Sequence, residues 1–340
     1  MKAIKSVLQR SSPMANPPLS TATSRTMSTT TTTPPTVKTR ICIISDTHNR
    51  VPNSPKMSKC AYREPFPTAD ILIHCGDITS TGLETEYEEV LDFLKKAKAE
   101  LKLVIAGNHD ITLHEELYLK RLKNKHNNVP EDVGKIREMW MGEEARRYGI
   151  VYLEEGTRTF ELGNGAKFTV YSSPWQPEYF DWAFTYPRNI DRFNPGQGLF
   201  KQNPANPVPN HGHLDIMLTH GPPMGIRDEI FHGKEHVGCD HLRRAVERCR
   251  PQIHCFGHIH EGWGAERMDW KTGTADFEEV DWGRVVEERG VYLDLSNGGG
   301  RPLKLGEETI FINASIMNLH YRPENAPFVV DVDLPTKESP

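Results

Sequence analysis

The stretch LVIAGNHD, residues 103–110, joins a short apolar run to a polar ending. Such a run is typical of a buried parallel strand, so a strand is predicted at its start. The polar residues then follow the carboxyl end of that strand, where open α/β sheets bind their ligands. Asn108 offers an amide oxygen, His109 an imidazole and Asp110 a carboxylate. The stretch therefore predicts an α/β fold and the edge of the sheet at which chemistry takes place.

Four other apolar runs end in the same way. The endings are Asp46-Thr47-His48 after RICIIS (40–45), Gly76-Asp77 after ILIH (71–74) and Cys75, His220 after DIMLT (215–219), and Gly257-His258-Ile259-His260 after IHCF (253–256). Strands of one sheet bring such endings together in space. In DTH and HIH, alternate residues lie on the same side of an extended segment, so both ends of each motif can reach one cluster.

The side chains collected in this way are carboxylates, an amide oxygen and imidazoles, without thiolates. Such ligands suit Mn, Fe, Zn or Co rather than Cu(I) or an iron–sulfur cluster. Seven candidate ligands are too many for one first-row ion and suit two ions that share a carboxylate. Two metals about 3.5–4 Å apart clamp the attacking and leaving oxygens of an in-line displacement and convert a bridging water to hydroxide. This pattern predicts metal-dependent hydrolysis of phosphoester bonds.

The region between the motifs predicts alternating strands and helices. Apolar residues at helical spacing predict a helix over 83–94 between the second and third strands, which makes a βαβ unit with parallel strands. Helices are also predicted over 113–148, in two pieces broken near Asn127–Pro130, and over 240–250. Further strands are predicted at 150–153, 157–162, 167–171, 291–295, 309–312 and 328–332.

Composition limits the class of protein. The chain has 340 residues, of which 37% are hydrophobic and 26% charged, as in a globular domain. The net charge of -5 does not favour bulk binding to nucleic acid or to an anionic membrane. No apolar run is long enough to span a bilayer. The six cysteines form no CxxC pair, which favours a reduced, intracellular protein, with the cytoplasm as the expected compartment.

The ends of the chain differ in composition from its centre. Residues 1–39 are rich in Ser, Thr and Pro and contain no Asp or Glu, so they are expected to be a disordered tail. The basic start MKAIKSVLQR leaves a mitochondrial targeting segment as the alternative. We expect one folded domain over 40–335 and a loose C-terminus over 336–340. The sequence does not indicate an oligomeric state.

The order DxH…GD…GNHD…H…GHIH across residues 46–260 resembles the signature of the calcineurin-like metallophosphoesterase superfamily. The segments 172–184, 255–264 and 311–335 look like its branch of metallophosphoesterase-domain-containing proteins, similar to class III cyclic-nucleotide phosphodiesterases. The resemblance covers residues 40–335. It implies a two-sheet α/β sandwich with mixed sheets, flanked by helices. It also implies a phosphodiesterase that acts on small nucleotides, cyclic nucleotides included.

Carried over residue by residue, the resemblance implies two divalent metal ions, with Mn favoured, and a bridging hydroxide as the attacking group. The implied ligands are Asp46, His48 and His260 for the first ion, Asn108, His220 and His258 for the second, and Asp77 for both. His109 would donate a proton to the leaving oxygen, and Asp110 would hold its ring. Such a general acid is worth about 10²–10⁴-fold in rate. Because Ser80 stands where the purple acid phosphatase branch has a tyrosinate ligand, no purple colour is expected.

Two rival functions remain open at this point: a phosphomonoesterase or protein phosphatase, and a scaffold that uses the fold without turnover. Asn49, Arg50 and Trp175 are candidate substrate contacts, against the alternatives of a solvated loop and of lid-like packing by the aromatic segment 172–187. His74 and His254 lie inside apolar runs. We expect these two histidines to be hydrogen-bonded in the core rather than to be ligands.

Overall fold

The structure, a computed structural model, describes residues 35–54, 57, 59–196, 204–230 and 234–337. The expected tail up to residue 34 and the end 338–340 lie outside the described residues. The expected domain boundary at residue 40 is too late, because strand β1 begins at Thr36. Thr36–Arg40 pair in antiparallel register with Asp331–Pro335. The Thr-rich composition of these residues resembles that of the tail, but their backbone groups form hydrogen bonds with β17, a strand distant in sequence.

The first sheet is mixed and has the strand order β15-β17-β1-β2-β3-β4. In that order its strands are Val291–Asp294, Phe328–Pro335, Thr36–Ile44, Ile71–His74, Leu101–Val104 and Ile150–Tyr152. The β1–β17 pair is antiparallel and the others are parallel. Helix α1 (Glu84–Lys96) connects β2 to β3, which confirms the predicted βαβ unit.

The second sheet is also mixed and has the order β14-β13-β16-β12-β9-β6-β5. In that order its strands are Thr274–Phe277, Gly264–Asp269, Glu308–Asn313, Ile253–Phe256, Ile216–Thr219, Lys167–Ser173 and Gly156–Glu161. The pairs β16–β12, β12–β9 and β9–β6 are parallel. Two small ladders join β7 (Gln176–Pro177) to β8 (Thr185–Tyr186) and β10 (Glu229–Ile230) to β11 (Glu235–His236).

Buried strand residues alternate between two environments. In β1, Ile41 and Ile43 belong to a cluster that also contains Ile253 and Ile310 of the second sheet, so this cluster lies between the sheets. Their neighbour Cys42 instead joins a cluster with helix α1. Because both faces of these strands are covered, the strands read as unbroken apolar runs. The predicted two-sheet α/β sandwich is confirmed.

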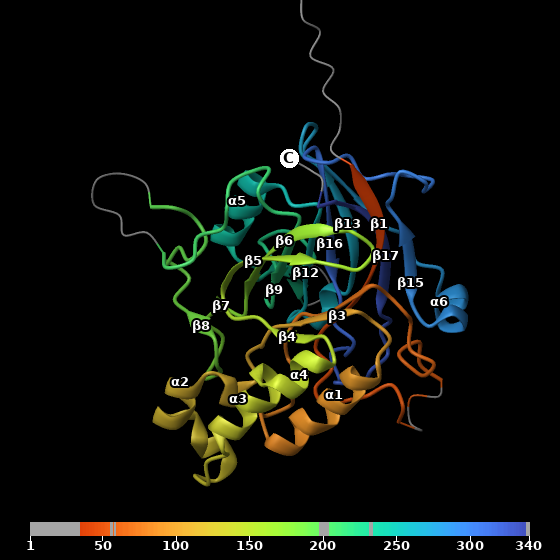
Figure 1. The fold of residues 1–340 in the computed structure, drawn as a ribbon. Helices are drawn as coiled ribbons and strands as arrows, with labels where there is room; N and C mark the ends of the chain where they lie inside the picture. The colour runs from red at the N-terminus through yellow and green to blue at the C-terminus, as the bar shows by residue number, and fades with distance from the viewer. Residues whose placement is uncertain (1–34, 55–56, 58, 197–203, 231–233, 338–340) are drawn as a thin grey trace, which may run out of the picture. The chain divides into compact units, whose positions relative to one another are not determined.

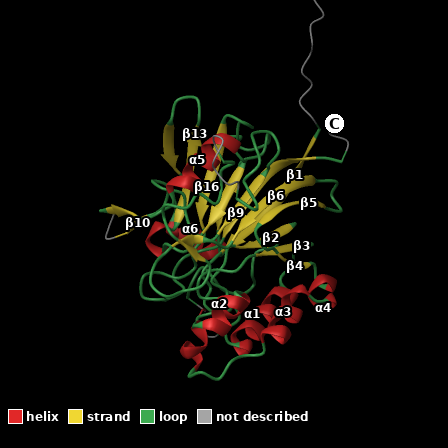
Figure 2. Cartoon of the chain, turned by 90° about the vertical axis from the view of Figure 1, so that its left-hand side faces the viewer, coloured by secondary structure: helices red, strands yellow, loops and turns green. Residues whose placement is uncertain are grey.

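Helices cover the outer face of each sheet (Figures 1 and 2). Helices α1, α3 (Val133–Met141) and α4 (Glu143–Arg147) lie beside β3 and β4, and α5 (Asp240–Cys249) packs on the second sheet. The predicted helical region 113–148 and its break near Asn127–Pro130 are confirmed, but each of the two predicted pieces is itself divided. The region contains η2 (Ile111–Leu113), α2 (Glu115–Lys120), η3 (Leu122–His126), α3 and α4. Strands β13 and β14, helix α6 (Trp282–Glu288) and the turn η4 (His260–Gly262) were not predicted.

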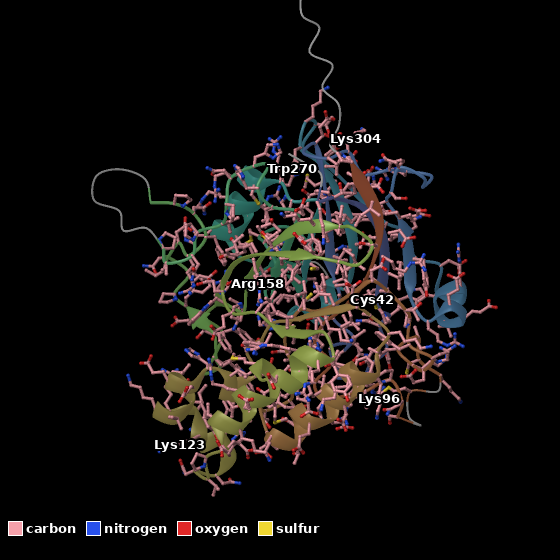
Figure 3. All side chains as sticks on the ribbon, viewed as in Figure 1. Cys42, Lys96, Lys123, Arg158, Trp270 and Lys304 are labelled. Carbon is pink, nitrogen blue, oxygen red and sulfur yellow. The ribbon has the colours of Figure 1, made fainter. Side chains whose placement is uncertain are left out.

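Figure 3 shows Lys123 among the helices that cover the first sheet, whereas Trp270 and Lys304 lie far from them, near the ends of the second-sheet strands. All six cysteines are free, and five of them are buried. Among the described residues, no helix is both long enough and apolar enough to cross a membrane.

Candidate metal centre

The five polar strand endings meet, but they come from two sheets and not from one as predicted. Strands β1, β2 and β3 belong to the first sheet, and β9 and β12 to the second. The backbone N–H of His258 donates to both carboxylate oxygens of Asp46, at 3.1 and 3.0 Å. Ser315, which follows β16, donates its hydroxyl to the same carboxylate at 3.0 Å. Both sheets therefore contribute to one centre.

Three groups of side chains at this centre have ligand atoms within 4.8 Å of one another: Asp46-His48-His260, His48-Asp77-His109 and Asp77-His220-His258. Asp77 lies between the others, since its Oδ2 is 3.7 Å from His48 Nε2 and its Oδ1 is 3.5 Å from His220 Nε2. These spacings exceed those of strong hydrogen bonds. Ligands held at about 2.0–2.2 Å from one ion lie roughly this far apart.

Asn108 extends the group around His220. Its side-chain oxygen lies 3.0 Å from His220 Nε2, and the residue is 5% exposed. The backbone carbonyl of Asn108 accepts a hydrogen bond from Ala183, which ties the aromatic segment 172–187 to the turn after β3. The structure thus brings all seven predicted ligands to one place.

The imidazoles are oriented by backbone carbonyls. The Nδ1 atoms of His48, His220 and His260 lie 3.1, 2.9 and 3.1 Å from the carbonyl oxygens of Thr79, Cys75 and Asn318. Because a carbonyl only accepts, each Nδ1 carries a hydrogen, and Nε2 is the nitrogen that keeps a lone pair for an ion when the ring is neutral. Histidines that bind metals are held in this way. The Nε2 atom of His48 is buried and has no hydrogen-bond partner, so the residues present fit a bound cation.

The pKa values of Asp46 and Asp77 are shifted in opposite directions. Burial and the neighbouring Asp46 and Asp110 raise the pKa of Asp77 well above its usual value. Burial also opposes ionisation of Asp46, but a hydrogen bond from His260 and nearby imidazoles outweigh it and hold that pKa well below its usual value. Among the described residues, the ion-pair partners of both are histidines. Buried carboxylates without a permanent cation are costly, and a metal ion removes that cost.

Several candidate ligands lie at strained backbone positions. Asp46, His48, Asp77 and His258 have φ values of 51°, 43°, 51° and 67°, in the left-handed region. Non-glycine residues there cost of order 1–3 kcal/mol each and cluster at functional sites. Backbone hydrogen bonds from Asp46 to Gly76 and from His48 to Asp77, at 2.9 and 3.1 Å, hold two of these positions in place.

The expected contact between Asp110 and the His109 ring was wrong. His109 Nδ1 lies 2.7 Å from the carbonyl oxygen of Ser80. The Asp110 carboxylate instead accepts hydrogen bonds from the backbone of Gly107, Ile78 and Thr79 and from the Thr79 hydroxyl, at 2.8–3.1 Å. A buried carboxylate satisfies nearby N–H groups first, and the loop after β2 supplies them. Asp110 therefore holds the loop that holds His109.

Three consecutive carbonyls of this loop each receive a histidine. Thr79 accepts from His48 at 3.1 Å and Ser80 from His109 at 2.7 Å. Thr81 accepts from His126 of η3 at 2.8 Å. The segment Thr79–Thr81 thus contacts a candidate ligand (His48), the candidate proton donor (His109) and a histidine of η3 (His126).

Comparisons with known proteins agree with this geometry. The family model described as calcineurin-like phosphoesterase matches residues 39–262. This chain belongs to the calcineurin-like phosphoesterases. The human and mouse proteins called metallophosphoesterase domain-containing protein 1 are each 30% identical to it over 301 residues, 87% of this chain and 72% of theirs. A UPF0046 protein of Caenorhabditis elegans is 34% identical over 221 residues, 60% of this chain and 50% of its own length.

The family and the clustered ligands make the chain a metal-dependent phosphoesterase of the metallophosphoesterase-domain-containing branch. A cavity of about 410 Å³ opens beside the centre of this calcineurin-like phosphoesterase. Residues that the sequence analysis did not single out form much of its wall: Trp182, Tyr179, Arg188, Glu261 and Tyr321. Tyr321 lies on the loop after β16, with its ring 4.9 Å from that of His48. Trp182 and Tyr179 belong to the aromatic segment 172–187, which was their signal in the sequence. No motif in the sequence pointed to Tyr321.

The three predicted substrate contacts lie outside this cavity. Arg50 is exposed, and Asn49 hydrogen-bonds Glu89 and Ser80 at 3.2 and 3.1 Å. Trp175 packs among His114, Phe184 and Arg192. The aromatic segment does reach the cavity, but through Trp182 rather than Trp175.

His74 and His254 are hydrogen-bonded in the core, as predicted. Both are fully buried. The Nε2 of His74 lies 2.9 Å from the Thr47 hydroxyl, and that of His254 lies 2.9 Å from the Thr219 hydroxyl. Each threonine directly precedes a candidate ligand, so these histidines support the centre from behind.

Proposed function

We propose that this phosphoesterase is a phosphodiesterase that hydrolyses small nucleotides, cyclic nucleotides included. The observation that carries the proposal is the position of Asp77 between two groups of candidate ligands, with His109 beside them. Two-metal centres of this kind suit in-line displacement at phosphorus. Hydrolysis of a diester also requires a proton for the leaving oxygen, and His109 is placed to supply one.

We propose that the centre holds two divalent ions, with Mn favoured. The first would be bound by Asp46, His48 and His260, the second by Asn108, His220 and His258, and Asp77 would be shared. Bound divalent ions supply an activated water and neutralise charge on the phosphoryl group. The O and N donor set admits Fe, Zn and Co as well.

His109 would act as the proton donor through its Nε2. Its Nδ1 is engaged by Ser80, so Nε2 is the free position of the ring, and His109 lines the cavity. Burial lowers the pKa of His109 to about 4, which disfavours the protonated ring when the cavity holds no anion. A phosphoryl anion beside the ring favours the charged form. Substrate binding thus promotes the form of His109 that donates.

The cavity suits a nucleotide in size and lining. About 410 Å³ falls in the range of pockets for small molecules. Tyr179 and Tyr321 are 62% and 52% exposed, and both line it. Their rings offer flat surfaces for a nucleobase, a contact worth about 1–3 kcal/mol per base. Arg188 adds a cation, and its guanidinium is held by the carbonyls of Gly238 and Val237 at 2.9 and 2.8 Å.

A substrate comparison tests the reaction class. Metal-loaded protein should hydrolyse bis-(p-nitrophenyl) phosphate faster than p-nitrophenyl phosphate and should turn over members of a nucleotide panel. Faster monoester turnover with a negligible diester rate would instead identify a phosphomonoesterase. No turnover of either ester with full metal occupancy would support the scaffold alternative.

Two variants test the centre. Asp77→Asn removes the shared charge and should lose both bound metal and activity. His109→Ala should keep its metal and lose about 10²–10⁴-fold in rate on substrates with poor leaving groups. His213→Ala, a histidine outside the centre, is the matched control and should behave as wild type. Metal content is measured by elemental analysis alongside kcat/KM.

We propose the cytoplasm as the compartment, since free cysteines suit a reducing environment. Mitochondrial targeting by the basic N-terminus is the alternative. A fluorescent fusion of the full chain should be cytoplasmic. Mitochondrial signal that is lost on deletion of residues 1–34 would establish the alternative.

A further inference from the structure

Trp182 stacks on the proposed proton donor. The ring centroids of Trp182 and His109 are 4.0 Å apart, and the ring planes differ by 29°. The next residue, Ala183, donates its backbone N–H to Asn108 at 3.3 Å and accepts a hydrogen bond from the Gln176 side chain at 2.9 Å. The indole is therefore held against the turn that carries His109.

The outer face of the same indole is also covered. The ammonium of Lys125, in η3, lies 3.7 Å from the centroid of the Trp182 ring. Such a cation over an aromatic face is attractive, more so where water is excluded. With His109 on one face and Lys125 on the other, Trp182 has no free face on which a substrate ring could stack.

Two further contacts hold the His109 ring, which still lines the cavity. The His48 ring meets it edge-on, with centroids 4.7 Å apart and planes 85° apart. Its Nδ1 is engaged by Ser80 at 2.7 Å. The hydrogen bond alone leaves the imidazole free to swing about that contact, and the flat indole removes this freedom. The stack therefore controls the direction of Nε2.

We propose that Trp182 is a positioning residue for proton transfer, which holds the His109 ring so that Nε2 faces the leaving oxygen. The inference rests on the proposed function. As the oxygen of the attacking water bonds to phosphorus, the P–O bond to the leaving group breaks. Its electron pair stays on the leaving oxygen, which takes the Nε2 proton of His109. The ring, now neutral, regains a proton from solvent. Trp182 contributes no proton and touches no reacting atom.

A series of aryl methyl phosphate diesters tests this role in the metal-loaded full chain. A p-nitrophenolate leaves without much protonation, whereas a phenolate needs the donor. Trp182→Ala should lower kcat/KM about 10–100-fold for the phenyl ester, because misplacing a catalytic group by about 1 Å costs this much. It should lower kcat/KM less than about 3-fold for the p-nitrophenyl ester, which needs the acid least.

Matched variants separate positioning from general damage. Trp182→Phe keeps a flat face and should retain activity on both esters, whereas Trp182→Leu keeps apolar bulk without one and should behave like Trp182→Ala. The leucine variant also serves if the alanine variant does not fold. Phe180→Ala, in the same segment but 79% exposed and outside the cavity lining, should match wild type. Metal content should be unchanged in all of them.

A double variant completes the test. In the His109→Ala background, Trp182→Ala should change the phenyl-ester rate less than about 2-fold, because the two residues act as a unit. Equal losses on both esters, or additive losses in the double variant, would overturn the inference and leave the proposed function standing. If His109→Ala itself shows no dependence on the leaving group, the proton donor is misassigned and both fall.

Discussion

Two glycines determine how closely the carboxylates of the centre approach their neighbours. A Cβ at Gly257 would lie 1.9 Å from Asp46 Oδ2 and 2.1 Å from Ser45 Oγ. A Cβ at Gly107 would lie 2.3 Å from both Asp77 N and Asp77 Oδ1. Neither glycine lies in the left-handed region, so the missing side chain matters here rather than backbone freedom. Gly107 begins the GNHD motif and Gly257 the GHIH motif, both of which are recognisable in the sequence.

Gly257→Ala should therefore damage the metal centre without removing a ligand. The added methyl pushes Asp46 from His260, and we expect metal affinity to fall roughly 10–100-fold, as for other changes that displace ligands. Gly300→Ala is the control, because a Cβ there meets nothing within 4 Å. Calorimetric titration with Mn measures both, and equal affinities would contradict the steric argument.

Asp110→Asn should destabilise the protein as well as slow it. The two carboxylate oxygens of Asp110 accept hydrogen bonds from Gly107, Ile78 and Thr79. An asparagine amide has only one acceptor oxygen, so its NH₂ group would face backbone N–H groups that have no other acceptor among the described residues around this buried site. Leaving buried donors unsatisfied costs about 1–3 kcal/mol each, so a loss of roughly 2–4 kcal/mol is expected. Urea unfolding of the metal-free protein measures the loss; a change below about 0.5 kcal/mol is the size expected for an ordinary surface substitution and would contradict it.

Residue types and spacing in the sequence predict which side chains meet, because each candidate ligand ends an apolar strand. They do not predict hydrogen-bond partners. Asp110 follows His109 directly in the chain, which suggested a contact between the two side chains. Both instead contact the loop after β2, Asp110 through Ile78 and Thr79 and His109 through Ser80. Trp175 and Trp182 are likewise alike in sequence, and only packing shows that one is enclosed by Arg192 and the other by His109.

At the scale of elements, apolar runs of four residues were sufficient to locate the central strands, because both faces of each are buried. Polar and short elements were missed for the opposite reason. The start of β1 is rich in threonine and pairs with β17, and β14 is exposed along its length. Their stability comes from partners distant in sequence, which a local pattern does not contain.

The β1–β17 pair carries a pH-dependent contact that can be measured. Arg40 donates to both oxygens of Asp331, at 2.7 and 2.9 Å. This bond, opposed by partial burial and aided by Lys38, lowers the pKa of Asp331. A carboxyl with a lowered folded-state pKa contributes stability above its unfolded pKa of about 3.9, and this is lost as pH falls through the folded value.

Asp331→Asn should accordingly reduce the free energy of unfolding by up to about 1 kcal/mol at pH 5–7, since Arg40 is partly exposed. The difference from wild type should shrink as pH falls below about 4. Urea unfolding of both proteins between pH 3 and 7 gives the curve. A difference that grows toward low pH would have the wrong sign for this contact.

At the scale of the whole molecule, the centre joins two sheets. Asp46, His48, Asp77 and Asn108 follow strands of the first sheet, and His220, His258 and His260 follow strands of the second. An ion bound as proposed, by residues of both groups, would stabilise the face-to-face packing of the sheets. The sequence order alone could not show this division, because the strands of both sheets are equally apolar.

Metal removal should therefore lower the melting temperature. At free metal 100-fold above Kd, each site adds about 2.7 kcal/mol, or roughly 4 °C for a domain of this size. Scanning calorimetry with Mn and with EDTA measures the difference. In Asp77→Asn the melting temperature should differ little between Mn and EDTA. A difference as large as in the wild type would mean that the stabilising ion binds at another site.

The loop whose three consecutive carbonyls each receive a histidine has a consequence for binding thermodynamics. His48, His109 and His126 lose their rotational freedom when the chain folds, before any ion or substrate arrives. Immobilising a side chain during association typically costs about 0.5–1.5 kcal/mol. Folding has already restricted these rings, through the carbonyls of Thr79, Ser80 and Thr81 and, for His109, through the Trp182 stack. The proposed ion binding at His48 and proton transfer from His109 would therefore lose little further conformational entropy.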